Sequence, residues 1–217
     1  MRIVSYDRNI DSFIFRSFHL VYIRRFLKGC DMKKYYTGIG SRETPKDICK
    51  LMEDIAFKLA SKDYILRSGA AQGADAAFEK GALAYAENVD ERVVLGQIYI
   101  PWDSFTTYDE YYKDWYKVLD RMPNKKEAEV IASEIHPAWE KCSRGAKLLH
   151  TRNVYQILGS SLKSPSQFLI CWAKLDKHGN IRGGTATAWN LAQKYNVPCF
   201  NLINEEDKQR LIKFVES

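Results

Sequence analysis

The strongest constraint on the fold is an alternation of apolar, strand-like runs with helical patterns, joined by turns that are rich in glycine. Three of these turns lie at residues 38–42 (Gly-Ile-Gly-Ser-Arg), 68–75 (Ser-Gly-Ala-Ala-Gln-Gly-Ala-Asp) and 183–185 (Gly-Gly-Thr). Strands that alternate with helices favour a parallel sheet covered by helices on both faces. In such a sheet the turns that follow the strands gather at its carboxyl edge, where ligands bind.

The spacing of apolar residues predicts where these elements lie. Strands are predicted at residues 35–40, 64–68, 97–102, 166–173 and 197–202. Helices are predicted after Pro45 and at residues 73–87, 108–116, 125–140, 146–162, 186–195 and 205–215. We therefore expect an α/β protein with a Rossmann-like three-layer fold and a mostly parallel sheet of five or more strands.

Residues 1–31 stand apart from this alternation. The stretch at residues 10–26 is aromatic, and the basic residues that interrupt it argue against a secretory signal peptide. Two interpretations stay open, an amphipathic helix for a membrane surface or partner and a segment upstream of a natural start at Met32. We favour the second. Either way we expect a peripheral appendage to a single domain over residues 32–217.

Composition narrows the class of protein. Of the 217 residues 46% are hydrophobic and 28% are charged, and no apolar run approaches the roughly 18 residues of a membrane span. The five cysteines show neither CxxC nor Cys/His ligand spacing, so we expect a cytoplasmic location, no disulfide and no metal site. The net charge of +6 suits a nucleotide or nucleic acid, although many basic proteins bind neither.

The first glycine-rich turn is suited to a phosphate group. Gly38 and Gly40 let the backbone approach a ligand, while Ser41 and Arg42 add a hydroxyl donor and a forked cation. The alternative is a capped helix start with a surface arginine. The turn is not a complete dinucleotide fingerprint, because Glu43 replaces the third glycine and no acidic residue ends the second strand. We therefore do not expect an NAD-dependent dehydrogenase.

The second turn combines a tight loop with acidic residues. Ser68, Gly69 and Gly73 permit a loop that cradles an anion. Asp75 begins the next helix, where it can cap N–H groups or accept hydrogen bonds from a sugar or base. Glu79 follows one helical turn later, and two carboxylates at this spacing can serve acid–base catalysis. Asp75 and Glu79 are therefore the candidate catalytic residues, and capping explains Asp75 equally well.

Two further motifs complete the predicted site. Gly183 and Gly184 precede Thr185, whose hydroxyl can cap a helix and bind phosphate. Arg152 and Asn153 follow His150, which is a less favoured candidate for a proton donor.

These motifs resemble the SMF/DprA–LOG superfamily of Rossmann-like nucleotide-binding proteins. The resemblance rests on the Gly-Ser-Arg turn, the Ser-Gly-Ala-x-x-Gly-Ala-Asp turn, the Arg152-Asn153 pair and the Gly-Gly-Thr turn, and it covers roughly residues 34–202. It is closest to the branch of DNA processing protein A (DprA), although Ala70 replaces the second glycine of that branch's turn. The resemblance implies that Arg152 faces the pocket and contacts phosphate.

The two branches of the superfamily imply different functions. DprA binds single-stranded DNA and loads recombinase onto it, and this chain resembles a compact, stand-alone form common among phage-encoded and bacterial proteins. The LOG branch consists of phosphoribohydrolases with the signature Pro-Gly-Gly-x-Gly-Thr-x-x-Glu. Residues 182–189 (Arg-Gly-Gly-Thr-Ala-Thr-Ala-Trp) lack its proline, one glycine and the glutamate. That hydrolase mechanism therefore does not carry over.

Three hypotheses follow. The first is a DprA-like protein that binds a nucleotide or single-stranded DNA, with a possible homodimer by analogy and no cofactor. The second is an N-glycosidase that uses Glu79 or Asp75. The third is a sensor of a signalling nucleotide, in which the aromatic stretch 108–116 is an interface rather than packing or a base-stacking surface.

Overall fold

Six parallel strands form one sheet in the computed structural model, which describes residues 33–89 and 93–217. The predictions for residues 1–31 lie outside this part of the chain. The strands are β1 (Lys34–Gly40), β2 (Tyr64–Ser68), β3 (Gly96–Ile100), β4 (Tyr116–Val118), β5 (Phe168–Trp172) and β6 (Cys199–Asn201). Their order is β4-β3-β2-β1-β5-β6. The prediction of a Rossmann-like α/β fold is confirmed.

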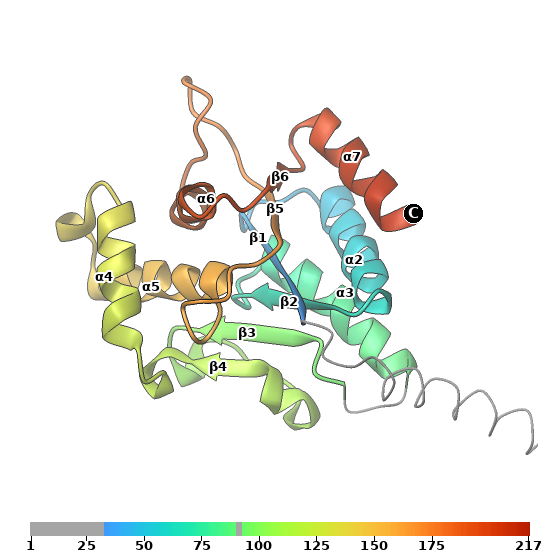
Figure 1. Ribbon diagram of the computed structural model, residues 1–217, viewed down its shortest axis with the longest axis horizontal. Helices are drawn as coiled ribbons and strands as arrows, with labels where there is room; N and C mark the ends of the chain where they lie inside the picture. The colour runs from blue at the N-terminus through green and yellow to red at the C-terminus, as the bar shows by residue number, and fades with distance from the viewer. Residues whose placement is uncertain (1–32, 90–92) are drawn as a thin grey trace, which may run out of the picture. The chain divides into compact units, whose positions relative to one another are not determined.

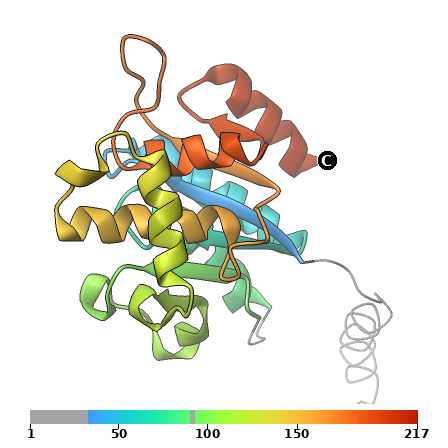
Figure 2. The same cartoon turned by 60° about the vertical axis from the view of Figure 1, so that its left-hand side comes forward.

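Helices cover both faces of the sheet, which gives three layers (Figures 1 and 2). One face carries α2 (Lys46–Ser61), α3 (Ala74–Asn88) and α7 (Glu205–Glu216); the other carries α4 (Lys125–Ile135), α5 (Arg144–Leu158) and α6 (Thr185–Lys194). Short 3-10 turns are η1 (Asp103–Phe105), η2 (Glu110–Trp115), η3 (Leu119–Arg121) and η4 (Trp139–Lys141). Among the described residues, no helix is both long and apolar enough to cross a membrane.

Two hydrophobic cores, one on each face, hold the layers together. The strand β5 is buried along its whole length, as expected for a strand that is covered on both faces. On one side Met52 and Phe78 pack among the fully buried residues of α2 and α3, and on the other Val154 and Leu191 do the same for α5 and α6. Lys34–Ser217 form one compact unit around these cores.

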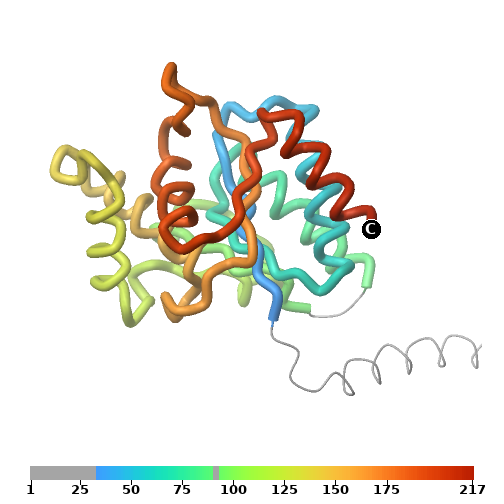
Figure 3. The backbone as a smooth tube through the Cα atoms, turned by 45° about the horizontal axis from the view of Figure 1, so that its top comes forward, coloured from blue at the N-terminus to red at the C-terminus, as the bar shows by residue number. Residues whose placement is uncertain are grey.

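The strand order reverses between β1 and β5, and this reversal fixes the place of the site. From β1 the chain builds outward through β2, β3 and β4, and it then returns to place β5 on the other side of β1. The tube view follows this return, with β1 in blue beside the later orange segment that carries β5 (Figure 3). The connections that leave β1 and β5 diverge to opposite faces, which opens a crevice at the carboxyl edge of the sheet.

Three of the predicted helices are wrong in their extent. The helix predicted at residues 146–162 is α5, which ends at Leu158 because Gly159 follows it with a φ of 71°. In place of a helix at residues 108–116, residues 110–115 form the 3-10 turn η2, and Tyr116 begins β4, because Tyr116 and Val118 pair with Ile98 and Ile100 of β3. Residues 125–140 form α4 only as far as Ile135. The residue before a proline disfavours the helical conformation, and Pro137 therefore ends the helix at its C-cap, His136.

Candidate functional site

A hollow of about 420 Å³ lies at the point where the strand order reverses. This volume falls within the range of about 300–1,000 Å³ that is typical of ligand sites. Seventeen residues line it: Ile39, Gly40, Ser41, Arg42, Glu43, Ala71, Asp75, Ala146, Leu149, His150, Arg152, Asn153, Gln156, Arg182, Gly183, Gly184 and Thr185. The hollow thus gathers residues from all three glycine-rich turns and from α5.

The turn after β1 forms one wall of the hollow. The N–H of Ser41 donates to the carbonyl of Trp172 at the end of β5 (2.9 Å), which ties the ends of the two central strands together. The hydroxyl oxygen of Ser41 accepts the N–H of Glu43 (3.0 Å), so the hydroxyl proton stays free to donate. Glu43 in turn pairs with Lys174 (2.8 Å) at the rim.

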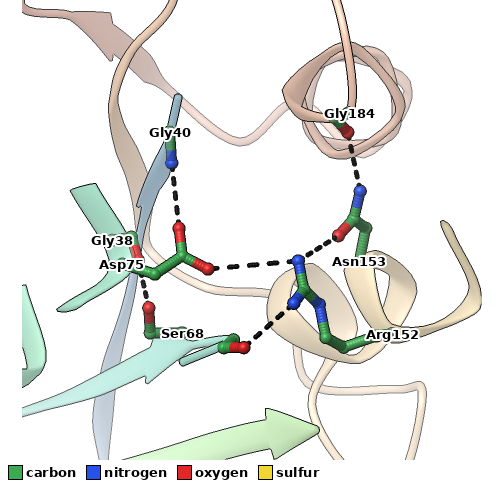
Figure 4. Close-up of polar contacts among 8 residues, drawn as sticks. Gly38, Gly40, Ser68, Asp75, Arg152, Asn153 and Gly184 are labelled. Carbon is green, nitrogen blue, oxygen red and sulfur yellow. Dashed lines mark hydrogen bonds and ion pairs between the residues drawn. The ribbon is translucent and has the colours of Figure 1, made fainter. Parts of the chain in front are cut away.

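The turn before α6 forms the opposite wall. The helix begins at Thr185 without a side-chain cap, and the side-chain amide of Asn153 donates to the carbonyl of Gly184 (2.8 Å; Figure 4). This bond anchors the turn to α5 and leaves backbone N–H groups of the first helical turn available to an anion. The hydroxyl of Thr185 also has no partner among the described residues.

Two exposed arginines flank the hollow. Within residues 33–89 and 93–217, no group forms a hydrogen bond or an ion pair with the guanidinium of Arg42 or of Arg182. Arg42 belongs to the turn after β1, and Arg182 immediately precedes the turn before α6. An unpaired guanidinium offers several N–H donors in a planar fork that matches a phosphate group. Arg182 was not among the predicted site residues.

The second glycine-rich turn, at residues 68–75, mainly supports the wall that the turn after β1 forms. The hydroxyl of Ser68 donates to the carbonyl of Gly38 (2.7 Å), and the N–H of Ala74 donates to the carbonyl of Ser41 (3.3 Å). Gly73 has a φ of +83°, and a Cβ there would lie 2.5 Å from the carbonyl oxygen of Ser41, so glycine is required. Ala70 takes a left-handed φ of 54°, the conformation that a glycine would adopt at lower cost.

A buried ion pair forms the floor of the hollow (Figure 4). Asp75 accepts the N–H of Gly40 (3.1 Å) and lies 3.9 Å from the guanidinium of Arg152. Arg152 also donates to the carbonyl of Gly69 (2.9 Å) and to Asn153 (3.3 Å). Burial raises the pKa of Asp75, and the neighbouring charge of Arg152 opposes this rise. The guanidinium of Arg152 therefore has several partners within the protein.

Unpartnered polar atoms lie around this ion pair. Oδ2 of Asp75, Nε of Arg152 and both side-chain polar atoms of Gln156 are buried without a hydrogen-bond partner in the described part of the chain. A buried polar atom that lacks a partner is costly, and it commonly marks the place of a ligand or water. Three such residues at one hollow indicate that it is built for a polar occupant.

The two candidate catalytic carboxylates have different positions. Asp75 lines the hollow, whereas Glu79 is not among the lining residues and accepts the hydroxyl of Tyr116 instead. Burial raises the pKa of the Glu79 carboxyl.

His150 lines the hollow as a neutral ring at pH 7. Burial, together with the nearby His136 and Arg152, lowers its pKa to about 4. Its Nδ1 lies 2.9 Å from the hydroxyl of Thr187 on α6.

The structure thus brings together most of the predicted site residues at one hollow: Gly40, Ser41, Arg42, Asp75, Arg152, Asn153, Gly183, Gly184 and Thr185. Gly38, Ser68, Gly69 and Gly73 support the walls from behind. Sequence reasoning missed Arg182 and Gln156. Buried polar residues run along α5 from His150 to Gln156, and a polar run in a buried helix is the signal that points to Gln156.

Comparison with known proteins gives one solved structure that is similar to this chain. No family model matches the chain, and no curated protein matches it significantly. The structure is similar to that of DNA processing protein A from Helicobacter pylori, a structure described as giving insights into a unique single-stranded DNA binding mode. The identity is 18% and the TM-score 0.48, and the match covers 78% of this chain and 65% of that one. This chain therefore spans less than two thirds of the neighbour's length.

Proposed function

We propose that the hollow binds the phosphate groups of a nucleotide or of single-stranded DNA, and that the protein serves DNA processing or recombination in the DprA-like manner implied by its motifs. One observation carries the proposal: the unpaired guanidinium groups of Arg42 and Arg182 and the uncapped N-terminus of α6 border a single hollow. These are three independent sources of positive potential for one anion.

The chemistry of the hollow explains how a nucleotide would be held. The phosphate lies against the N–H groups at the start of α6, between Arg42 and Arg182. Glycine at positions 183 and 184 lets the phosphate oxygens approach the backbone closely. The ribose or base then lies toward Asp75 and Arg152, whose unpartnered atoms offer an acceptor and a donor. Because the recognised group is phosphate, this arrangement supports binding without requiring catalysis.

Removing either flanking arginine is expected to weaken binding. Arg42→Ala and Arg182→Ala each delete one charge-assisted phosphate contact, and we expect about a tenfold loss of affinity from each. Binding of a labelled oligothymidylate is measured by fluorescence anisotropy at several salt concentrations. The slope of log affinity against log salt should become shallower by about 0.7 for each lost phosphate contact.

A matched control variant distinguishes binding at the hollow from an effect of the protein's net charge. Arg121 at the end of η3 is exposed and pairs with Asp103 of η1 (2.7 Å), and it is not among the residues of the hollow. Arg121→Ala removes the same charge and should leave affinity within about twofold of the wild type, since a remote surface charge is screened. Equal losses in all three variants would show that binding depends on net charge rather than on the hollow.

A catalytic alternative rests on Asp75, whose carboxylate lines the hollow and whose Oδ2 forms an ion pair with Arg152 but no hydrogen bond within the described residues. A raised carboxyl pKa suits a general acid that protonates a leaving base. Incubation with a panel of nucleoside monophosphates, followed by chromatography for free base, tests this activity. Release of base by the wild type that is lost in Asp75→Asn supports an N-glycosidase, and no release leaves the binding function.

A further inference from the structure

A second polar cluster lies between α4, η4 and α5. It consists of His136 at the C-cap of α4, Cys142 directly after η4, and His150 on α5. One nitrogen from each imidazole and the sulfur of the thiol all lie within 4.8 Å of one another. The three residues come from separate elements, which is why their spacing along the sequence resembles no known metal motif.

The distances suit a small, borderline-soft metal ion. The sulfur of Cys142 lies 3.7 Å from Nδ1 and 3.9 Å from Nε2 of His136, and the two imidazole rings have centroids 4.2 Å apart. With Zn–N bonds of about 2.0 Å and Zn–S bonds of about 2.3 Å, tetrahedral geometry places neighbouring ligand atoms about 3.3–3.6 Å apart. Closure on an ion therefore requires side-chain movements of about 1 Å.

The surroundings of His150 resemble those of a metal ligand. Its Nδ1 lies 2.9 Å from the hydroxyl oxygen of Thr187, a residue that is 3% exposed and fixed on α6. When Nδ1–H donates to that oxygen, the lone pair of Nε2 is left free. Histidines that ligate metals commonly donate their other ring N–H to an oxygen in this way, which fixes the ring.

His136 has to turn in order to ligate. Its Nδ1 accepts the N–H of Ala138 (3.2 Å), and the sulfur of Cys142 lies at similar distances from both ring nitrogens, so it is not in line with the lone pair of either. Rotation about χ2 exchanges the bond to Ala138 for a bond to the ion, and this torsion is broad in histidine. His136 and Cys142 are both half-buried, so an ion can reach them from solvent.

We propose that His136, Cys142 and His150 bind a divalent metal ion of the zinc type. Two imidazoles and a thiolate select zinc over magnesium or calcium, which prefer oxygen ligands. Three protein ligands leave the fourth position for water, as in sites where zinc takes part in chemistry. On binding, the Cys142 thiol releases its proton to solvent and the sulfur donates an electron pair to the ion. The argument for this site does not rest on nucleotide binding, although His150 also lines the hollow.

Cobalt(II) titration of the full chain tests the site, because a thiolate ligand gives a charge-transfer band in the near ultraviolet. We expect one equivalent of cobalt to produce this band and zinc to displace it. Cys142→Ser should abolish the band and weaken zinc affinity at least about tenfold, since a metal ligand is lost. His136→Asn, a second half-buried position, should weaken zinc affinity to a similar extent.

Matched variants control for unrelated thiols and imidazoles. Cys49 is also half-buried, and its thiol donates to a backbone carbonyl at 3.6 Å, as that of Cys142 does. Cys49→Ser and His178→Asn, the latter at an exposed position, should keep both the band and the affinity. Absence of a thiolate band in the wild type, or zinc affinity that is unchanged in either Cys142→Ser or His136→Asn, overturns the proposal.

Discussion

Replacing Arg152 with methionine is expected to lower the free energy of unfolding by about 3–5 kcal/mol. The side chain of Arg152 is 10% exposed and that of its partner Asp75 is 3% exposed. Methionine fills much of the same space but leaves the carboxylate of Asp75 without a countercharge in a buried position. The loss arises from this uncompensated charge, and from the lost hydrogen bonds to Gly69 and Asn153, rather than from a cavity. Urea unfolding followed by circular dichroism measures it through the midpoint and slope of the transition.

The double variant Arg152→Met/Asp75→Asn is the control for this explanation. It removes both charges, and replacement of a buried ion pair by neutral groups is often close to neutral for stability. We therefore expect the double variant to be more stable than Arg152→Met alone, with a coupling of about 1–3 kcal/mol between the two positions. An Arg152→Met protein as stable as the wild type would contradict the buried pairing.

Replacing Gly81 with alanine is expected to destabilise the protein by about 2–3 kcal/mol through overpacking. Gly81 lies on α3 where it crosses α2, and a Cβ at this position would come within 2.1 Å of the carbonyl oxygen of Glu53. A backbone atom cannot move aside as the end of a side chain does, so the two helices must separate. Alanine gains about 1 kcal/mol over glycine in helix propensity, and this gain is smaller than the free-energy cost of separating the helices.

Gly145 provides a matched comparison on a second helix. It lies in the first turn of α5, and a Cβ there would meet no atom within 4 Å. Gly145→Ala should therefore raise stability by about 0.5–1 kcal/mol, because alanine has the better helix propensity and no clash results. The two substitutions are chemically identical. Opposite changes in the free energy of unfolding, measured with urea, would therefore show that the loss at Gly81 comes from the crossing of α2 and α3. Similar effects at both positions would contradict the close packing of α2 and α3.

The central part of the fold could be predicted from sequence because local patterns and topology agree there. The strands β1, β2 and β5 are apolar runs that end at glycine or polar turns, and parallel strands bring such turns to one edge. The convergence of Arg42 and Thr185 on one hollow follows from this rule. The strand β4 could not be predicted, because three residues acquire their structure from pairing with β3 rather than from their own pattern.

The finer features of the site depend on contacts that no local pattern records. Arg152 lies in a motif associated with phosphate binding, but its pairing with Asp75 depends on how α5 packs across the sheet. The proximity of His136, Cys142 and His150 likewise depends on the end of α4 at Pro137 and the turn that follows it. Such residues lie on separate elements and approach one another only when the helices pack, so the sequence alone does not predict the cluster.

The most direct test of the anion-binding hollow is to locate the bound ligand by amide chemical shifts. An isotope-labelled sample of the full chain is titrated with a short oligothymidylate, and shifts are followed for each backbone N–H. We expect the largest changes at residues 183–185 and at Ser41 and Arg42, where phosphate meets the walls of the hollow. Changes confined to residues between α4 and α5 that lie outside the hollow, such as Lys125, Arg144 and Lys147, with the amides of the hollow unmoved, would contradict the account.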